Sequence, residues 1–229
     1  MHDLTAFTTL KLPFKAQAVL QIKSKKNIAS SISQVAHRDH LILSGGSNVV
    51  ALDSEFDGVV IRPEIRDWDV SIKGDLVFLE VGAGHVWHDV VMNTLAKGWF
   101  GLENLALIPG WVGAAPIQNI GAYGVELKDH CHSVTVYDFE QRKLLTLDAS
   151  DLQFSYRHSI LKDNPGRFLV VSVTVGLSTK ASEISYEVDP ERVRPTELKT
   201  FIGDFKKFQD LTGWTPEIKF EQTMNSVLN

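Results

Sequence analysis

The stretch from Gly101 to Gly124, GLENLALIPGWVGAAPIQNIGAYG, sets glycine and proline among small apolar residues. Polar side chains that can contact a ligand stand between them, namely Glu103, Asn104, Gln118, Asn119 and Tyr123. This much glycine disfavours a regular helix, and the low polarity is not typical of a disordered linker. The pattern therefore predicts backbone that packs closely against something, most simply a flat or phosphate-bearing ligand.

A second glycine cluster lies upstream, at Ser44-Gly45-Gly46-Ser47-Asn48, directly after the apolar run Leu41-Ile42-Leu43. A phosphate-binding turn follows a strand in the same way, because backbone N–H groups there can surround an anion. A tight turn between two strands would use the same residues. Two such clusters in one small protein suggest a ligand with two ends, such as a dinucleotide.

Composition narrows the class of protein. The chain has 229 residues, enough for one large domain or two small ones. A net charge of −5 without a block of Lys or Arg argues against nucleic acid or an anionic membrane as the main partner. The single cysteine, Cys131, excludes an internal disulfide and fits a reducing compartment.

No segment of the sequence resembles a signal peptide or reaches the ~20 apolar residues that span a bilayer. We therefore expect a cytoplasmic protein. His85 and His88 have a spacing that can hold a metal, with Asp89 nearby, but no third ligand is evident. We expect no metal site.

The order of apolar runs predicts an α+β protein. We expect strands at 18–22, 41–43, 59–61, 68–72, 76–81, 134–137 and 168–175. Helical patterns lie at 26–36 and 85–96, and Gly98 is a candidate C-terminal cap of the second helix. No GxGxxG motif follows a strand, so the Rossmann dinucleotide fold is not expected.

Four blocks carry a resemblance to a known family. They are SGGSNVV at 44–50, VGAGHVWHDVV at 81–91, the stretch at 101–129 and FSYRHSILK at 154–162. Together they closely resemble the UDP-N-acetylenolpyruvoylglucosamine reductases, also called UDP-N-acetylmuramate dehydrogenases. The resemblance runs from about residue 7 to about residue 177.

The resemblance implies a flavoprotein oxidoreductase of bacterial cell-wall peptidoglycan synthesis. In that family NADPH reduces a bound FAD, which then reduces the enolpyruvyl group of a UDP-sugar to give UDP-N-acetylmuramate. The implied fold is the FAD-binding fold of the vanillyl-alcohol-oxidase type, with two α+β lobes. We place the first lobe at 1–66 and the second at 67–187. The oligomeric state is not indicated.

The resemblance also implies a set of site residues. Arg157 matches the family's catalytic arginine, which grips the substrate carboxylate, and Tyr186 matches a substrate-contacting tyrosine. We expect a side chain at Gly46 to occupy the space of the phosphate, and Gly121 and Gly124 to let the flavin approach closely. The expected cofactor-binding residues are Ser44, Gly45, Gly46, Ser47, Asn48, Pro109, Gly110, Gly113, Gln118, Asn119, Gly121, Ala122, Tyr123 and Gly124.

Two residues depart from the family pattern. Trp111 stands where the family has a small residue, and its ring could stack on flavin or adenine or block the pocket. His158 stands where the family has Asp, so the charge at this position differs from the family's.

After about residue 187 the sequence changes character. Residues 189–229 resemble the C-terminal end of GDP-mannose 4,6-dehydratase, in the features DPERVRPTE and GWTPEIKFEQT. We expect a short helical tail over 188–229, with helices near 205–211 and 220–228. Either the tail simply covers the flavin lobe, or a gene fusion has put a dehydratase end in place of the reductase's substrate domain.

The catalytic set implied by the resemblance is incomplete. The family's proton-donating serine, in a GSFFKNP-like motif, and its C-terminal glutamate have no match in this sequence. We therefore expect weak turnover or none. A non-catalytic FAD-binding remnant or fusion product is one alternative. A sugar-nucleotide dehydratase fragment is another, disfavoured because the sequence has neither a Rossmann motif nor a Tyr-x-x-x-Lys pair.

Overall fold

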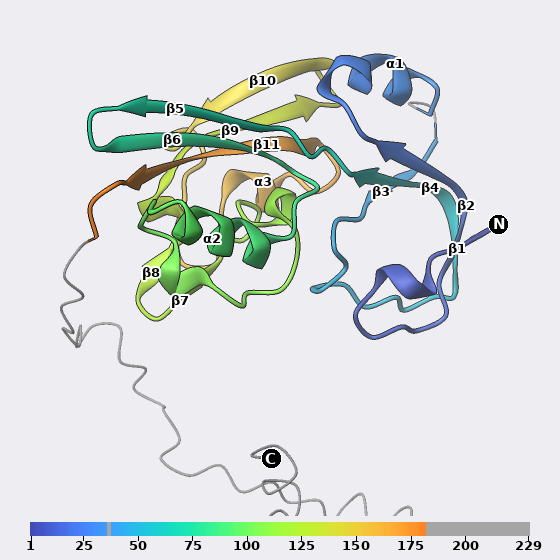
Figure 1. Ribbon diagram of the computed structural model, residues 1–229. Helices are drawn as coiled ribbons and strands as arrows, with labels where there is room; N and C mark the ends of the chain where they lie inside the picture. Colours follow the sequence, from blue (N-terminus) through green and yellow to red (C-terminus); the bar gives the residue numbers. More distant parts are fainter. Residues whose placement is uncertain (36–37, 182–229) are drawn as a thin grey trace, which may run out of the picture. The chain divides into compact units, whose positions relative to one another are not determined.

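The computed structural model describes residues 1–35 and 38–181, which form two lobes that each contain a β-sheet (Figure 1). The first sheet has the order β1-β2-β4-β3, with β2 and β3 both parallel to β4 and β1 antiparallel to β2. Its strands are β1 (His2–Asp3), β2 (Lys15–Ile22), β3 (His40–Ile42) and β4 (Glu55–Pro63). The central strand β4 is buried from Gly58 to Pro63, which its apolar GVVI run favours.

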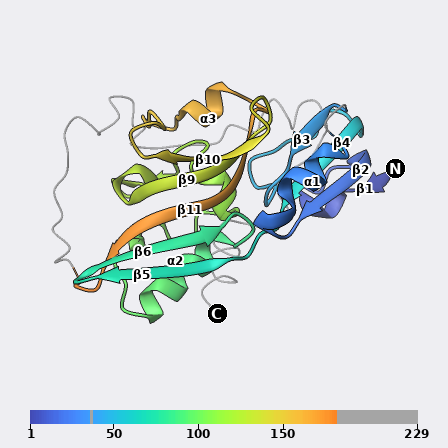
Figure 2. The same ribbon diagram turned by 90° about the horizontal axis from the view of Figure 1, so that it is seen from above.

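The second sheet is antiparallel throughout, in the order β10-β9-β11-β6-β5. Its strands are β5 (Trp68–Lys73), β6 (Leu76–Gly82), β9 (Cys131–Asp138), β10 (Lys143–Asp148) and β11 (Phe168–Ser178). Helix α2 (Trp87–Ala96) lies against one face of this sheet (Figures 1 and 2), where Trp87, Val90 and Val91 join the core formed with β6, β9 and β11.

Short elements complete the two lobes. The two-stranded hairpin of β7 (Gly121–Ala122) and β8 (Val125–Glu126) precedes β9, and α3 (Ile160–Asp163) precedes β11. Helix α1 (Ile28–Ser33) belongs to the first lobe and buries Ile28 and Ile32. The single-turn 3-10 helices are Thr5–Phe7, Lys25–Asn27, Glu103–Leu105, Val112–Ala114 and Leu127–Asp129.

The two lobes share an apolar cluster. Residues of the first lobe, including Ile22, Val59 and Ile61, pack in one buried cluster with Tyr137 and Leu169 of the second sheet. Each such side chain contributes about 1.5–3 kcal/mol when it is fully removed from water. The lobes are therefore joined by a common core and not by a flexible linker alone.

Polar contacts add to this junction. Lys25 pairs with Glu80 of β6, and the Ser172 hydroxyl of β11 donates to the same carboxylate at 2.6 Å. Burial raises the pKa of Glu80, but the hydrogen bonds from Lys25 and Ser172 outweigh it, and the net pKa lies below its usual value. On the other side, His40 Nε2 lies 3.0 Å from the Gly166 carbonyl oxygen.

The segment between the lobes packs against the VGAG block at 81–84. The amide of Gly82 donates to Asp67 O at 2.9 Å, and the amide of Gly84 donates to Ile65 O at 2.8 Å. A Cβ at Gly82 would lie 2.5 Å from Ile65 O, and one at Gly84 would lie 2.6 Å from the carbonyl carbon of Glu64. Both positions need glycine because two backbone segments meet there.

The structure contains all seven strands expected from the sequence, each longer than the apolar run that indicated it or shifted by a residue or two. Gly98 has φ +69° after α2, as a C-terminal cap requires. The helix expected at 26–36 is a 3-10 turn followed by α1, and α2 begins at Trp87 because His85 and Val86 pair with the loop around Trp111. Strand β10 was not expected from the sequence.

The first sheet ends at Pro63 and the second begins at Trp68. The lobe boundaries stay a prediction. The expected tail at 188–229 and Tyr186 lie outside the described residues. Among the residues that the structure describes, no helix is long and apolar enough to cross a membrane.

Asp138, at the end of β9, is fully buried and holds the following turn together. Its carboxylate accepts hydrogen bonds from Arg167 at 2.9 Å and from the amides of Glu140 and Gln141. Burial raises the pKa of this carboxyl, but the bonds from Arg167 and the two amides lower it more, so its pKa lies below the usual value.

We predict that Asp138→Asn lowers the free energy of unfolding by about 2 kcal/mol at pH 7. Because the folded-state pKa lies below the unfolded value of about 3.9, the carboxylate stabilises the fold above that pH. This contribution disappears as the pH falls through the folded-state pKa. Urea unfolding at pH 7 and at pH 3 measures both effects, with the exposed Asp148→Asn as the control. A loss of equal size at both pH values would contradict the ion-pair role.

Candidate functional site

The loop at 44–48 follows the buried Leu43 and is fixed by backbone contacts. Gly46 has φ +67°, and its carbonyl accepts a hydrogen bond from the Thr9 amide at 3.2 Å. A Cβ at Gly46 would lie 2.0 Å from Phe7 O. A side chain here would collide with the N-terminal segment, which requires glycine for a structural reason, and the expected clash with a phosphate stays a prediction.

The buried side chain of Arg62 binds the backbone of this loop. Its side chain is 3% exposed, and its Nη1 donates to Ser44 O at 3.2 Å. The guanidinium lies 4.0 Å from the ring centroid of Phe7 and 4.8 Å from that of Trp111. Glu64 neutralises the charge of Arg62, because its Oε1 accepts a hydrogen bond from Arg62 Nε at 3.0 Å. A buried cation of this kind needs a partner and filled hydrogen-bond positions, and Arg62 has both.

The second glycine-rich loop, at 109–118, is bound through its backbone to residues 83–85 of the second lobe. Val112 donates to His85 O at 2.9 Å, and Gly113 donates to Ala83 O at 3.0 Å. A Cβ at Gly113 would lie 2.7 Å from the Ala83 side chain. Residues 112–114 form a single 3-10 turn.

The two loops face one another across a cavity of about 250 Å³. Ser47 Oγ donates to Pro109 O at 3.3 Å, and Asn48 Nδ2 donates to Gln118 Oε1 at 3.2 Å. A Cβ at Gly45 would lie 3.3 Å from Gly110 Cα. The cavity is lined by Ile42, Ser44, Gly45, Gly46, Ser47, Asn48, Val49, Trp87, Pro109, Trp111, Ala114, Ala115, Ile117, Gln118, Ile120 and Lys162.

The cavity lining suits an anionic ligand. Ser44 Oγ is buried and has no hydrogen-bond partner among the described residues. Lys162 is the one charged side chain among the described residues that line the cavity. Polar donors that the protein does not satisfy, next to glycine-rich backbone, are what a phosphate-bearing ligand requires.

Several expected cofactor residues do not line this cavity. Asn119 is fully buried with φ +44°; its Nδ2 donates to Ser155 O at 3.0 Å, and its Oδ1 accepts from the Lys128 amide at 2.9 Å. Its side chain therefore serves the local fold. Gly110 (φ +116°) and Gly113 are not among the lining residues: Gly110 packs against Ser47, and Gly113 packs against Ala83.

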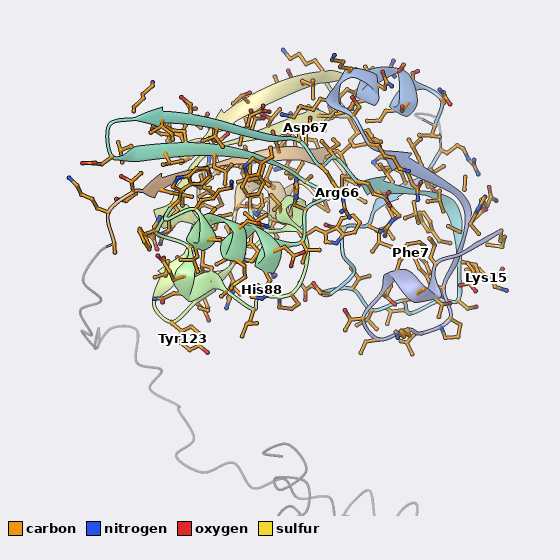
Figure 3. All side chains as sticks on the ribbon, in the orientation of Figure 1. Phe7, Lys15, Arg66, Asp67, His88 and Tyr123 are labelled. Atoms are coloured by element: carbon orange, nitrogen blue, oxygen red, sulfur yellow. The ribbon has the colours of Figure 1, made fainter. Side chains whose placement is uncertain are left out.

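The hairpin of β7 and β8 explains two further glycines. A Cβ at Gly121 would lie 2.9 Å from Val125 O, so its missing side chain admits the partner strand. Tyr123 (φ 51°) and Gly124 (φ 80°) form the turn, as a two-residue hairpin loop with positive φ requires. The Tyr123 side chain is 86% exposed and points outward at the tip (Figure 3). Ala122 is part of β7 and is half-buried.

Arg157 lies in a tight turn in which Ser155 and His158 pair through their backbones. It is exposed, has φ 54°, and its Nη2 donates to Gly121 O at 2.8 Å. Positive φ at a non-glycine residue costs free energy, and here the tight turn imposes it. Lys162 Nζ donates to Arg157 O at 3.0 Å, which connects this turn to the cavity. His158, in place of the family's Asp, lies 3.1 Å from the Asp163 carboxylate.

Sequence reasoning missed two residues, Arg62 and Lys162. A lone charge at the end of the apolar strand VVIRP was a signal for Arg62, and Lys162 closes the FSYRHSILK block. Neither had a local motif of its own.

Other groups do not form a site. His88 Nδ1 accepts from the Leu107 amide at 3.2 Å, and within the described residues no group of metal-ligating side chains gathers. Burial raises the pKa of Cys131 to about 12, so its thiol stays protonated at neutral pH. A larger cavity of about 480 Å³ lies at the ends of β6, β9 and β11, but it contains none of the expected site residues.

A family model described as "FAD binding domain" matches residues 16–148, more than half of the chain. The chain belongs to the FAD-binding domain family. A second model, "GDP-mannose 4,6 dehydratase", matches residues 161–227. It confirms the expected resemblance of the C-terminal part and begins earlier than expected, at α3 and β11 of the second lobe.

The expected relatives are also found. Proteins named UDP-N-acetylenolpyruvoylglucosamine reductase from Dechloromonas aromatica and Psychrobacter arcticus are 45% and 38% identical to this chain. The matches cover 77% and 85% of this chain but 53% and 57% of those proteins. The chain thus spans little more than half the length of the curated relatives it matches.

Solved structures give the same fold. A UDP-N-acetylenolpyruvylglucosamine reductase from Thermus caldophilus has a TM-score of 0.63 at 27% identity, over 76% of this chain and 60% of that one. A solvent-stable cholesterol oxidase has a TM-score of 0.50 at 15% identity, over 73% of this chain and 36% of that one. The expected α+β FAD-binding fold is confirmed for the described residues.

We predict that Gly46→Ala destabilises the protein far more than Gly74→Ala. Both glycines have positive φ, which costs an L-residue about 1–2 kcal/mol. A Cβ at Gly74 meets nothing within 4 Å, whereas at Gly46 it would overlap the Phe7 carbonyl. We expect a loss of about 3 kcal/mol or more for Gly46→Ala, measured by urea unfolding. Equal losses in the two variants would contradict the close approach of the N-terminal segment.

Proposed function

We propose that this protein binds FAD non-covalently, with the diphosphate in the cavity between the 44–48 and 109–118 loops. The observation that carries the proposal is the meeting of these two glycine-rich loops around an unsatisfied hydroxyl and one lysine. Backbone N–H groups would hold the phosphates, together with the side chains of Ser47 and Asn48 once these exchange their bonds to Pro109 O and Gln118 Oε1 for bonds to the ligand. The cavity suits part of a dinucleotide, and the rest would extend along the 109–124 stretch.

The proposed activity is that of the relatives named UDP-N-acetylenolpyruvoylglucosamine reductase, an NADPH-dependent reduction of a UDP-sugar. Bound FAD would supply the hydride-transfer chemistry. Arg157 would bind the substrate carboxylate and stabilise the negative charge that develops on it, because a guanidinium remains charged and offers two parallel donors. Tyr186 is proposed as a further substrate contact.

Further proposals accompany this function. The partners are NADPH and the UDP-sugar, without nucleic acid or a membrane, and the compartment is the cytoplasm. The lobes at 1–66 and 67–187 would clasp the cofactor together, and 188–229 would be the dehydratase-like helical tail. A non-catalytic FAD-binding protein is the second candidate, favoured by the absence from the sequence of a match to the family's serine and glutamate motifs.

Flavin binding tests the proposal directly. The purified full chain, incubated with excess FAD and desalted, should absorb near 450 nm and release free FAD into the supernatant after acid precipitation. Non-covalent binding is expected because no His or Cys stands in an evident flavin-linkage motif. Flavin that stays with the precipitate would contradict the non-covalent mode. A colourless protein after reconstitution would contradict FAD binding altogether.

NADPH oxidation with the enolpyruvyl UDP-sugar separates the two candidates. Loss of a proton donor commonly costs about 10²–10⁴-fold in rate, and missing remote contacts weaken orientation of the substrate. We therefore expect slow turnover from a protein that still holds flavin. No detectable turnover would favour the non-catalytic candidate, and a rate of about 10 s⁻¹, ordinary for an enzyme, would show that the chain supplies a substitute donor.

We predict that Arg157→Ala weakens binding of the enolpyruvyl substrate and leaves FAD bound. The change removes a charge-assisted interaction of about 1.5–3 kcal/mol. Titration of the flavin spectrum with substrate measures the affinity. Arg142→Ala is a matched control, because Arg142 is also an exposed arginine with positive φ and lies in the β9–β10 turn. Unchanged substrate affinity in Arg157→Ala would limit its role to holding Gly121 O.

A further inference from the structure

Trp111 is fixed in place at the edge of the cavity. The centroid of its ring lies 4.8 Å from the guanidinium carbon of Arg62. The ring of Phe7 also contacts this guanidinium, at a centroid distance of 4.0 Å. The Trp111 backbone also pairs with Val86. A stacked cation contributes to the orientation of an aromatic ring. The indole is thus a rigid part of the cavity wall.

The edge of the ring that carries the N–H group lies against the phosphate-binding loop. A Cβ at Gly45 would lie 3.1 Å from Trp111 Cδ1 and 3.3 Å from its Nε1. The absence of a side chain at Gly45 gives this edge its room. Within the described residues, Trp111 Nε1 donates no hydrogen bond, whereas Trp87 Nε1 donates to Leu105 O at 2.8 Å.

These contacts bear on the two roles considered from the sequence. One face of the ring lies over Arg62, so only the opposite face is left for stacking on a flavin or adenine. A ring that filled the pocket would leave no cavity, yet about 250 Å³ remains between the loops, with Trp111 in its lining.

We propose that Trp111 determines ligand specificity in this chain: its Nε1–H donates to a phosphate oxygen of the bound ligand, beside the Ser44 hydroxyl. Both residues line the cavity, the Ser44 hydroxyl is buried without a hydrogen-bond partner among the described residues, and phosphate oxygens accept such bonds strongly. The proposal rests on the proposed FAD site and adds to it a side-chain donor for the diphosphate. It makes the site selective for phosphate-bearing ligands over riboflavin.

The test compares Trp111→Phe with Trp99→Phe in the full-length protein. Phenylalanine keeps an aromatic ring beside Arg62 and removes the N–H group together with the rest of the five-membered ring, so riboflavin binding and thermal stability serve to separate lost packing from a lost donor. Trp99 packs against the core of the second lobe and does not line the cavity. Dissociation constants for FAD, ADP and riboflavin are measured by fluorescence or calorimetry, and thermal unfolding of the ligand-free proteins reports on the fold.

We expect Trp111→Phe to weaken FAD and ADP about tenfold, as the loss of one hydrogen bond to a charged group would, with riboflavin affinity unchanged. Trp99→Phe should change none of the three. Equal FAD and ADP affinity in wild type and Trp111→Phe overturns the inference, and so does a parallel loss for riboflavin. If the wild type binds ADP but not FAD, the proposed function fails while the ADP comparison still decides the role of Trp111. Failure to bind either ligand overturns both.

Discussion

The buried guanidinium of Arg62 is the interaction on which the site depends. It joins four segments: the N-terminal segment through Phe7, the first glycine loop through Ser44 O, the segment between the lobes through Glu64, and the second glycine loop through Trp111. Apolar packing could bring these segments together but could not fix their register. The directional bonds of one buried cation do so, at the cost of its desolvation.

Sequence reasoning found seven of the strands and both glycine loops because strand periodicity and turn chemistry are local. It could not see which glycines face a ligand. Gly82, Gly84, Gly113 and Gly121 lie where two pieces of backbone meet, and a sequence pattern does not distinguish that requirement from close approach of a cofactor. Arg62 was missed for the same reason, since its partners are distant along the chain. Strand β10 was missed because its KLLTLD pattern is short and half exposed.

The two resemblances meet within one folded unit. The dehydratase-like match begins at residue 161, yet α3 and β11 there complete the FAD-type sheet, and β11 is its central strand. If the chain arose by fusion, the structural junction would lie beyond β11 and not at the start of that match. The family membership therefore concerns the fold of the described residues, and the matches extend over only 53% and 57% of the lengths of the two relatives.

The core that both lobes share has a consequence for how a ligand enters and leaves. Ile61 of the first lobe and Leu169 of the second are fully buried in the same cluster, so parting the lobes would expose apolar surface on both sides. Exchange by the opening of two rigid halves would be slow for that reason. Local displacement of a single loop exposes far less apolar surface, so a ligand that exchanged by this route would require neither sheet to unfold.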